Sequence, residues 1–299
     1  MESWIYFVVF SQITLSGIFI IDKFVFSKNY VKSPLAYAVL TGISASFVIF
    51  LLPFKKFSML SYTDSLIAFL ASITFIFAIV LYYMAINYDE ISKIAIMFQL
   101  VPVFVLALSV IFLNEMLTSK RLAGFFILLV AGIIVSYKKT NAKFGINKAF
   151  YYILASAFLL GISWITSKHI LSVTNFWNGF MWFRITTIPA LFFLFFPKVR
   201  REFSNGFKKM KDNTRKLLAI KIIADFLAAV FIEYALFIGP ASLVSSLSAS
   251  LTPLFVFIFA LAISLCLPKI MKEEIGARSI FLKFIAISMV AVGIFMINS

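Results

Sequence analysis

The sequence predicts an all-α membrane protein with ten transmembrane helices, and three observations lead to that prediction. The 299 residues are 63% hydrophobic and only 13% charged, and a soluble protein of this length has no interior large enough to bury that much apolar surface. Runs of about 20 apolar residues recur along the chain, and each is long enough to cross a hydrocarbon core of about 30 Å. A helix satisfies its own backbone polar groups inside lipid, so a helical bundle is the expected architecture.

Ten apolar segments can be placed along the chain, separated by short connections. The connection 197–216 is the exception: it is longer, rich in Lys and Arg, and expected to be a loop. No segment is left over that could form a soluble domain. The expected spans are residues 4–21, 34–52, 64–88, 92–113, 121–137, 149–171, 174–196, 217–238, 241–266 and 279–297.

The two halves of the chain, residues 1–145 and 146–299, resemble each other, and the matching segments occur in the same order. Chance similarity between hydrophobic helices explains one match more easily than four in order. Each half holds five spans, an odd number, so the second half is expected to insert upside down, as in many transporters. The matching pairs are residues 16–23 with 161–168, 50–55 with 194–198, 85–105 with 235–256, and 130–133 with 290–294.

A run of small and hydroxyl residues from Gly239 to Pro253 lies between two apolar runs, at membrane depth. A helix that faced only lipid would not need so many hydroxyl groups, whereas small residues allow helices to approach closely and hydroxyls can bond across them or face water. Ser245, Ser246 and Ser250 are therefore candidate cavity residues. We expect helix breaks or hinges at Pro102, Gly239, Pro240 and Pro253.

Arg184 is the one basic residue in the middle of an expected span. A charge there costs roughly 2.5–3.5 kcal/mol on insertion scales, so it should face the protein interior or water. It either pairs with an anionic group of a substrate or bonds helix-end carbonyls. Glu233 lies deep in the eighth span, where it could contact substrate, carry a proton or bond a neighbouring helix.

Two further groups are candidates for proton coupling. Asp225 stands four residues after Lys221, and these two residues could simply form an ion pair along one helix face. His169 is the single histidine of the chain, and it lies at a span end, where an interfacial position is the alternative.

The remaining candidates for the cavity are polar or aromatic residues placed deep in the expected spans. Each could line a pathway or only join helices, and an aromatic ring could also stack on a flat ligand. They are Ser16, Tyr83, Gln99, Ser163, Trp164 and Trp182.

Composition excludes several kinds of site. One cysteine and one histidine leave no basis for a disulfide or for a metal site built from several histidines or cysteines. No metal or cofactor is expected, and no nucleotide-binding motif accompanies the spans. The net charge of +15 could suggest nucleic acid, but the basic residues cluster between spans, which is typical of loops that anchor a membrane protein.

The distribution of Lys and Arg also predicts an orientation. Loops after odd-numbered spans, with the span ends beside them, hold 21 of the 27 basic residues, those after even-numbered spans hold five, and Arg184 is the last. The positive-inside rule then places the odd loops in the cytoplasm and both termini outside.

Several of these segments resemble the EamA-type families of the drug/metabolite transporter superfamily. The resemblance rests on residues 240–253, on 102–104 with Asn114-Glu115 and 131–133, on 161–168, and on Phe183-Arg184-Ile185. It extends over nearly the whole chain and implies two five-helix repeats. Leu40 stands where the first half would carry a counterpart of Arg184, which suits an asymmetric ligand.

The resemblance also implies a function. It indicates alternating-access transport of a small metabolite, amino acid or drug-like molecule across a cell membrane, by a monomer or homodimer, rather than enzyme activity. A channel or lipid scramblase on the same scaffold is the alternative, followed by a membrane-embedded enzyme. The usual orientation of such transporters, with termini inside, disagrees with the charge count.

Overall fold

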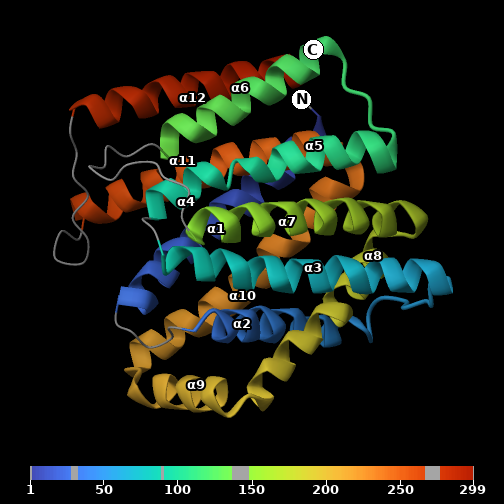
Figure 1. Cartoon of the computed structure of the whole chain (residues 1–299), viewed down its shortest axis with the longest axis vertical. Coiled ribbons are helices and arrows are strands. Elements are labelled where there is room, and N and C mark those ends of the chain that lie inside the picture. The colour runs from blue at the N-terminus through green and yellow to red at the C-terminus, as the bar shows by residue number, and fades with distance from the viewer. Residues whose placement is uncertain (1, 28–32, 89–90, 137–147, 267–276, 299) are drawn as a thin grey trace.

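A computed structural model describes residues 2–27, 33–88, 91–136, 148–266 and 277–298 of the chain. These residues form helices joined by short connections, and no β-strand occurs among them. Figure 1 shows long helices packed side by side in one bundle. The amide of Glu2 donates a hydrogen bond of 2.8 Å to Oδ1 of Asn298, so both termini lie at the same end of the bundle, the terminal end. The opposite end is the distal end.

The helices follow the expected spans closely, because each apolar run is helical. Seven of the ten spans form one helix each, and three are divided into two consecutive helical pieces. The first half comprises α1 (Ser3–Ser27), α2 (Pro34–Ser46) continued by the 3-10 helix η1 (Phe47–Leu51), α3 (Tyr62–Ile86), α4 (Ile91–Met97), α5 (Leu100–Leu113) and α6 (Ser119–Ser136). The second half comprises α7 (Lys148–Val173), α8 (Phe176–Thr187) continued by the 3-10 helix η2 (Ile188–Phe195), α9 (Pro197–Lys209), α10 (Asp212–Ile238), α11 (Ala241–Cys266) and α12 (Ala277–Asn298).

Within the described residues, nine segments are long and apolar enough to cross a membrane. The remaining expected span, residues 217–238, corresponds to α10, which is 27 residues long but is not among the nine. Lys221, Asp225 and Glu233 lie in its apolar stretch, and three charges make it more polar than the other spans. The structure is thus an all-α multi-pass membrane protein, and α10 is its most charged long helix.

Two of the helix breaks expected at prolines do not occur at those residues. The fourth span breaks at Phe98–Gln99, three to four residues before Pro102, because a proline ring clashes with the carbonyl four residues earlier. Helix α11 continues through Pro253 without a break. Pro253 cannot donate to the carbonyl of Ala249, and Nε2 of Gln99 donates to that oxygen instead, at 3.0 Å. The Gly239–Pro240 pair does separate two helices, α10 and α11.

The expected loop at residues 197–216 is mostly helical. Pro197 starts α9, a position that suits its fixed φ and missing N–H. Val199, Gly206 and Met210 are buried against the bundle, while the basic residues face outward. The buried residues recur at the spacing of one helix face, which is the sequence pattern of an amphipathic helix. The high charge of the segment suggested a loop instead.

The two halves of the chain pack against each other along two pairs of helices. Helix α3 packs against α7, and α1 packs against α10. Two hydrogen bonds link these pairs: Oγ of Ser156 donates to the carbonyl of Ala78 at 2.8 Å, and Oγ of Ser11 donates to that of Ala228 at 2.9 Å.

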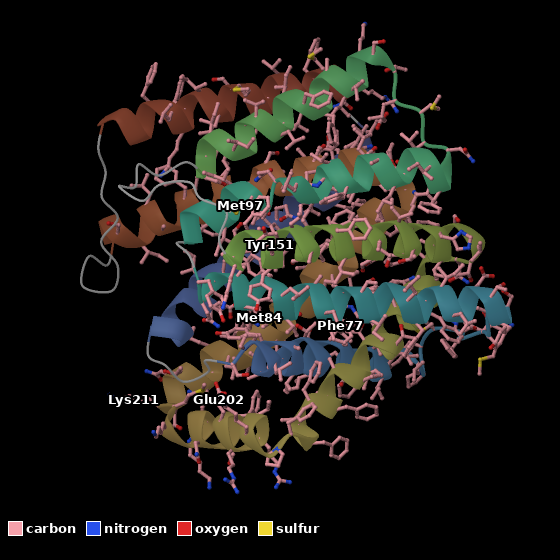
Figure 2. All side chains as sticks on the ribbon, in the orientation of Figure 1. Phe77, Met84, Met97, Tyr151, Glu202 and Lys211 are labelled. Carbon is pink, nitrogen blue, oxygen red and sulfur yellow. The ribbon has the colours of Figure 1, made fainter. Side chains whose placement is uncertain are left out.

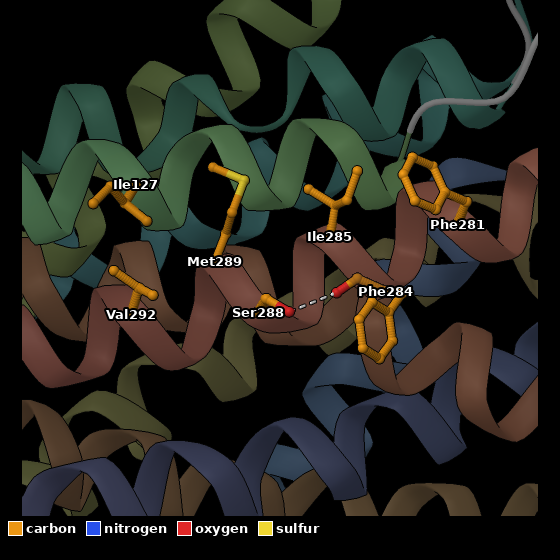
Figure 3. A pocket seen from close by; sticks show the side chains of 7 residues that line it. All are labelled: Ile127, Phe281, Phe284, Ile285, Ser288, Met289 and Val292. Atoms are coloured by element: carbon orange, nitrogen blue, oxygen red, sulfur yellow. Dashed lines mark hydrogen bonds between the residues drawn. The ribbon is translucent and has the colours of Figure 1, made fainter.

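Helices α6 and α12 lie side by side along one edge of the bundle (Figure 1). A Cβ on Gly124 would lie 3.0 Å from the carbonyl oxygen of Gly293, so these glycines allow the two backbones to approach closely. Figure 3 shows a pocket on this pair, lined by apolar side chains and Ser288. The Ser288 hydroxyl donates to the carbonyl of Phe284 at 3.2 Å, so no charged group or unused donor marks this pocket as a polar site.

Candidate functional site

Charged side chains lie at intervals along α10, from the distal end toward the terminal end. Lys221, Asp225 and Glu233 occur in that order. Helix α10 packs against α1, α2, α7 and α8, so these charges meet helices from both halves of the chain. This side of α10 is the candidate functional site.

Lys221 forms an ion pair with Asp22 of α1, at 3.5 Å between Nζ and Oδ1, and both residues are buried. The expected ion pair between Lys221 and Asp225 is therefore wrong, because Asp22 faces Lys221 from the neighbouring helix. Asp22 was not singled out in the sequence, although it lies in the segment 16–23 that the two halves share. Asp225 instead acts on Arg184 of α8 through longer-range electrostatics.

Arg184 is buried, with 3% of its surface exposed. The Cζ atom of its guanidinium lies 5.4 Å from the ring centre of Phe180 and 5.7 Å from that of Phe226. Among the described residues, no carboxylate pairs with it within 4.0 Å, and its Nε has no hydrogen-bond partner. Asp225 and Glu233 act on it only through longer-range electrostatics. A guanidinium without a paired carboxylate can donate two parallel hydrogen bonds to an anionic group of a ligand.

Glu233 is also buried, with 8% exposed, and its Oε2 has no hydrogen-bond partner in the described part of the chain. The next residue, Tyr234, packs against Phe7 and Phe176, with ring centres 4.5 Å and 4.9 Å apart. The charge of Arg184 acts on Glu233 without a direct ion pair. The site thus holds a guanidinium and a carboxyl group that are both buried and are not paired with each other.

The serine run of α11 faces the interior, since Ser245, Ser246 and Ser250 are all buried. Each of these hydroxyls donates to the carbonyl three residues earlier in the same helix, at 2.8–3.0 Å. Hydroxyls that donate to their own backbone do not need an acceptor on another helix, so α11 can pack closely against its neighbours at these positions.

A second polar group joins α1, α5 and α11. Oγ of Ser16 donates to the carbonyl of Thr252 at 3.1 Å, and the Thr252 hydroxyl bonds Oε1 of Gln12. Gln99 reaches the carbonyl of Ala249, as described above, and Gly132 of α6 leaves room for its side chain. Ser16 and Gln99 are candidates from the sequence, and only packing shows which groups they bond.

Ser163 and Trp164 lie on α7 between the two halves. Oγ of Ser163 donates to the carbonyl of Ala71 on α3 at 2.8 Å. Trp164 is half-buried and packs against two of the hydrophobic clusters of the bundle. Both residues are therefore placed at the contact between α7 and the first half.

Trp182, Tyr83 and His169 have partners of their own outside this group. Nε1 of Trp182 donates to the carbonyl of Ser58 at 3.0 Å in the connection before α3. Tyr83 stacks on Tyr37, with ring centres 4.1 Å apart, near the end of α3. His169 pairs with Asp64 at 3.1 Å at the terminal end.

The junction between α10 and α11 is held at the terminal end by two charged groups. Nζ of Lys168 donates to the carbonyls of Leu236, Phe237 and Gly239, at 2.7, 3.2 and 2.9 Å. Oε1 of Glu115 accepts the amide of Ala241 at 2.9 Å. A cation at the end of α10 and a carboxylate at the start of α11 satisfy backbone groups that have no partner within the helices. Both charges also interact favourably with the helix dipoles.

No cluster of three or more His, Cys, Asp or Glu residues suited to a metal occurs within the residues that the structure describes. The side chains gathered along α10 are instead a guanidinium, carboxyls and aromatic rings. Such a set can bind a small polar or amphiphilic molecule and can exchange a proton at a carboxyl group.

Comparisons with known proteins show a match to a transporter family and a shared fold. Residues 2–137 match the model of the EamA-like transporter family. The match covers the first half, whereas the resemblance in the sequence was expected over nearly the whole chain. No curated protein matches. A crystal structure of another protein superposes with a TM-score of 0.69 and 11% sequence identity, covering 100% of this chain and 98% of that one; at that identity it shows a shared fold alone.

Proposed function

We propose, on the premise that residues 2–137 form an EamA-like transporter domain in an all-α multi-pass membrane protein, that the chain is a secondary active transporter of the cell membrane. It moves a small metabolite, amino acid or drug-like molecule by alternating access, as an exporter or exchanger. The observation that carries this proposal is the buried guanidinium of Arg184, which lies against the rings of Phe180 and Phe226 and has no carboxylate paired to it among the described residues.

The ligand contacts follow from the charges along α10. Leaving a buried charge unpaired is expensive, and a ligand that pairs with it recovers part of that cost. An anionic group of the substrate pairs with Arg184, and an apolar part lies against Phe180 and Phe226. Glu233 faces a cationic group of the same molecule or carries a proton, since its buried Oε2 has no partner among the described residues.

The resemblance between the two halves supports alternating access. The bonds from Ser11 to Ala228 and from Ser156 to Ala78 each link one half to the other. The bond from Gln99 to Ala249 joins the matched segments 85–105 and 235–256. Contact between matched segments is expected near a two-fold axis that relates inverted repeats, where substrate sites of this architecture lie.

The contacts at the terminal end indicate which side is closed in this conformation. Lys168 and Glu115 hold the α10–α11 junction there, and Arg121 of α6 pairs with Glu2 at 2.6 Å. We infer that transport requires these contacts to open while contacts at the distal end close. From the excess of basic residues in the distal connections, the distal end faces the cytoplasm.

Proteoliposomes test the proposal with a panel of labelled amino acids and other small metabolites. A substrate should show saturable counterflow in the native protein. Arg184→Met should lose at least about 90% of that flux and keep or raise the melting temperature, since replacing an unpaired buried charge by an apolar side chain of similar length is often neutral or stabilising. Arg184→Lys should retain the charge but not the bidentate geometry, and fall between them.

The exposed Lys120, in the first turn of α6, supplies the control. Lys120→Met should transport like the native protein. If Arg184→Met unfolds the protein, the guanidinium is a structural group. If it transports normally, Arg184 is outside the substrate site, and flux that never saturates would indicate a channel or scramblase.

A further inference from the structure

The outer face of α9 is strongly basic. Five cationic side chains on this helix of 13 residues are exposed, while Val199, Gly206 and Met210 on the other face are buried. Figure 2 shows side chains with nitrogen ends projecting from α9 away from the bundle. The exposed basic residues are Lys198, Arg200, Arg201, Lys208 and Lys209.

Neighbouring carboxylates do not neutralise this face. In the described part of the chain none of the five basic residues forms an ion pair. The acidic residue within α9 is Glu202, and its Oε1 accepts the backbone amide of Ser33 at 2.7 Å. Asp212, just after α9, pairs with Arg215 at 3.2 Å. The cationic charge of α9 is therefore directed outward.

Exposed phenylalanines flank the basic face. Phe195 and Phe196, directly before α9, are 80% and 55% exposed. Phe207 within α9 differs from them, because the guanidinium of Arg215 lies over its ring. An acidic protein or a nucleic acid would be matched by charge alone, whereas rings beside the charge at the end of membrane spans match the boundary between headgroups and acyl chains.

We propose that α9 binds the headgroup phosphates of anionic phospholipids in the leaflet at the distal end, with the flanking phenylalanines inserted among the upper acyl carbons. Anchored on the bundle by its apolar face, α9 presents its cations as a preformed surface. Because α9 connects the helix that carries Arg184 with the helix that carries Glu233, a bound headgroup also fixes the position of that connection. This binding does not depend on whether the chain transports a solute.

Native mass spectrometry of the full chain in detergent tests the proposal, with dioleoyl-phosphatidylglycerol and dioleoyl-phosphatidylcholine as probes. The native protein should bind the anionic lipid at least about tenfold more tightly than the zwitterionic one. Each basic residue near an anionic surface contributes roughly a factor of five. The double variant Arg200→Gln/Arg201→Gln should therefore lose at least about tenfold in affinity for phosphatidylglycerol and little for phosphatidylcholine.

The matched control is Lys56→Gln/Lys120→Gln, which removes two exposed charges at the terminal end. It should bind phosphatidylglycerol as the native protein does. Equal binding of the two lipids, or equal loss in the two variants, would overturn the proposal. Displacement of the lipid by an equal concentration of inorganic phosphate would also overturn it, because the site would then take free phosphate. All of the substituted side chains are exposed, and unchanged melting temperatures verify that the variants are folded.

Discussion

At the scale of single residues, Gln99 compensates for Pro253. A proline inside α11 removes one helical hydrogen bond, and the amide of Gln99 supplies the missing donor to the carbonyl of Ala249. The side chain fits because position 132 on α6 is glycine: a Cβ there would lie 2.6 Å from Oε1 of Gln99. Three residues on three helices therefore depend on one another.

Gly132→Ala tests this dependence. The added methyl group forces Gln99 away from Ala249 and leaves a buried carbonyl without its donor, which costs about 1–3 kcal/mol. The melting temperature in detergent should fall by several degrees. In a Gln99→Ala background the same substitution should have little further effect, and an undiminished effect there would show that the strain arises elsewhere.

Gly17→Ala is the control for this prediction. No atom lies within 4 Å of a Cβ at position 17, although Gly17 also lies inside a helix. Alanine should therefore be neutral or stabilise α1 by up to about 1 kcal/mol through helix propensity.

At the scale of elements, the junction of α10 and α11 differs from an ordinary turn. Gly239 is required there because a Cβ would lie 2.6 Å from Cγ of Trp4. Lys168 and Glu115 belong to other elements, so the junction is held from outside rather than by its own helices. Such a contact can be released without unfolding α10 or α11, which suits a gate at the terminal end.

Lys168→Met is expected to loosen this junction. It removes the donor to three carbonyls, so the terminal end should open more often. In a Cys266→Ala background, a cysteine introduced at Ser242 should react with an impermeant maleimide at least about threefold faster when Lys168 is Met. Lys120→Met should leave the labelling rate unchanged, and an unaltered rate in both variants would show that Lys168 does not hold the gate.

At the scale of the whole molecule, the distribution of basic residues and the family resemblance predict opposite orientations in the membrane. The distal connections carry most of the Lys and Arg residues, including the basic face of α9. An excess of 21 basic residues to five strongly favours the distal end in the cytoplasm.

Labelling of intact cells decides between the two orientations. With Cys266→Ala as background, Lys120→Cys at the terminal end should react with an impermeant maleimide added outside. Ser204→Cys on α9 should react only after the membrane is permeabilised. The reverse pattern would place both termini in the cytoplasm and move the lipid surface of α9 to the outer leaflet.

The sequence by itself determined the class of the molecule, the approximate bounds of its long helices and the match of residues 2–137 to the EamA-like transporter family. These follow from local properties, because apolar runs of membrane length form helices wherever they pack. The helical state of 197–209 was missed because its strong charge suggested a loop, although buried positions recur at helical spacing.

Only the tertiary structure decided which polar groups meet. Lys221 bonds Asp22 of α1 rather than its neighbour along α10, and Gln99 finds a carbonyl 150 positions away in the chain. It also left Arg184 and Glu233 buried without satisfying each other. Hydrophobic periodicity specifies that a residue lies in a helix and does not specify which helix faces it. Partners therefore emerge from packing, and the candidate site depends on them.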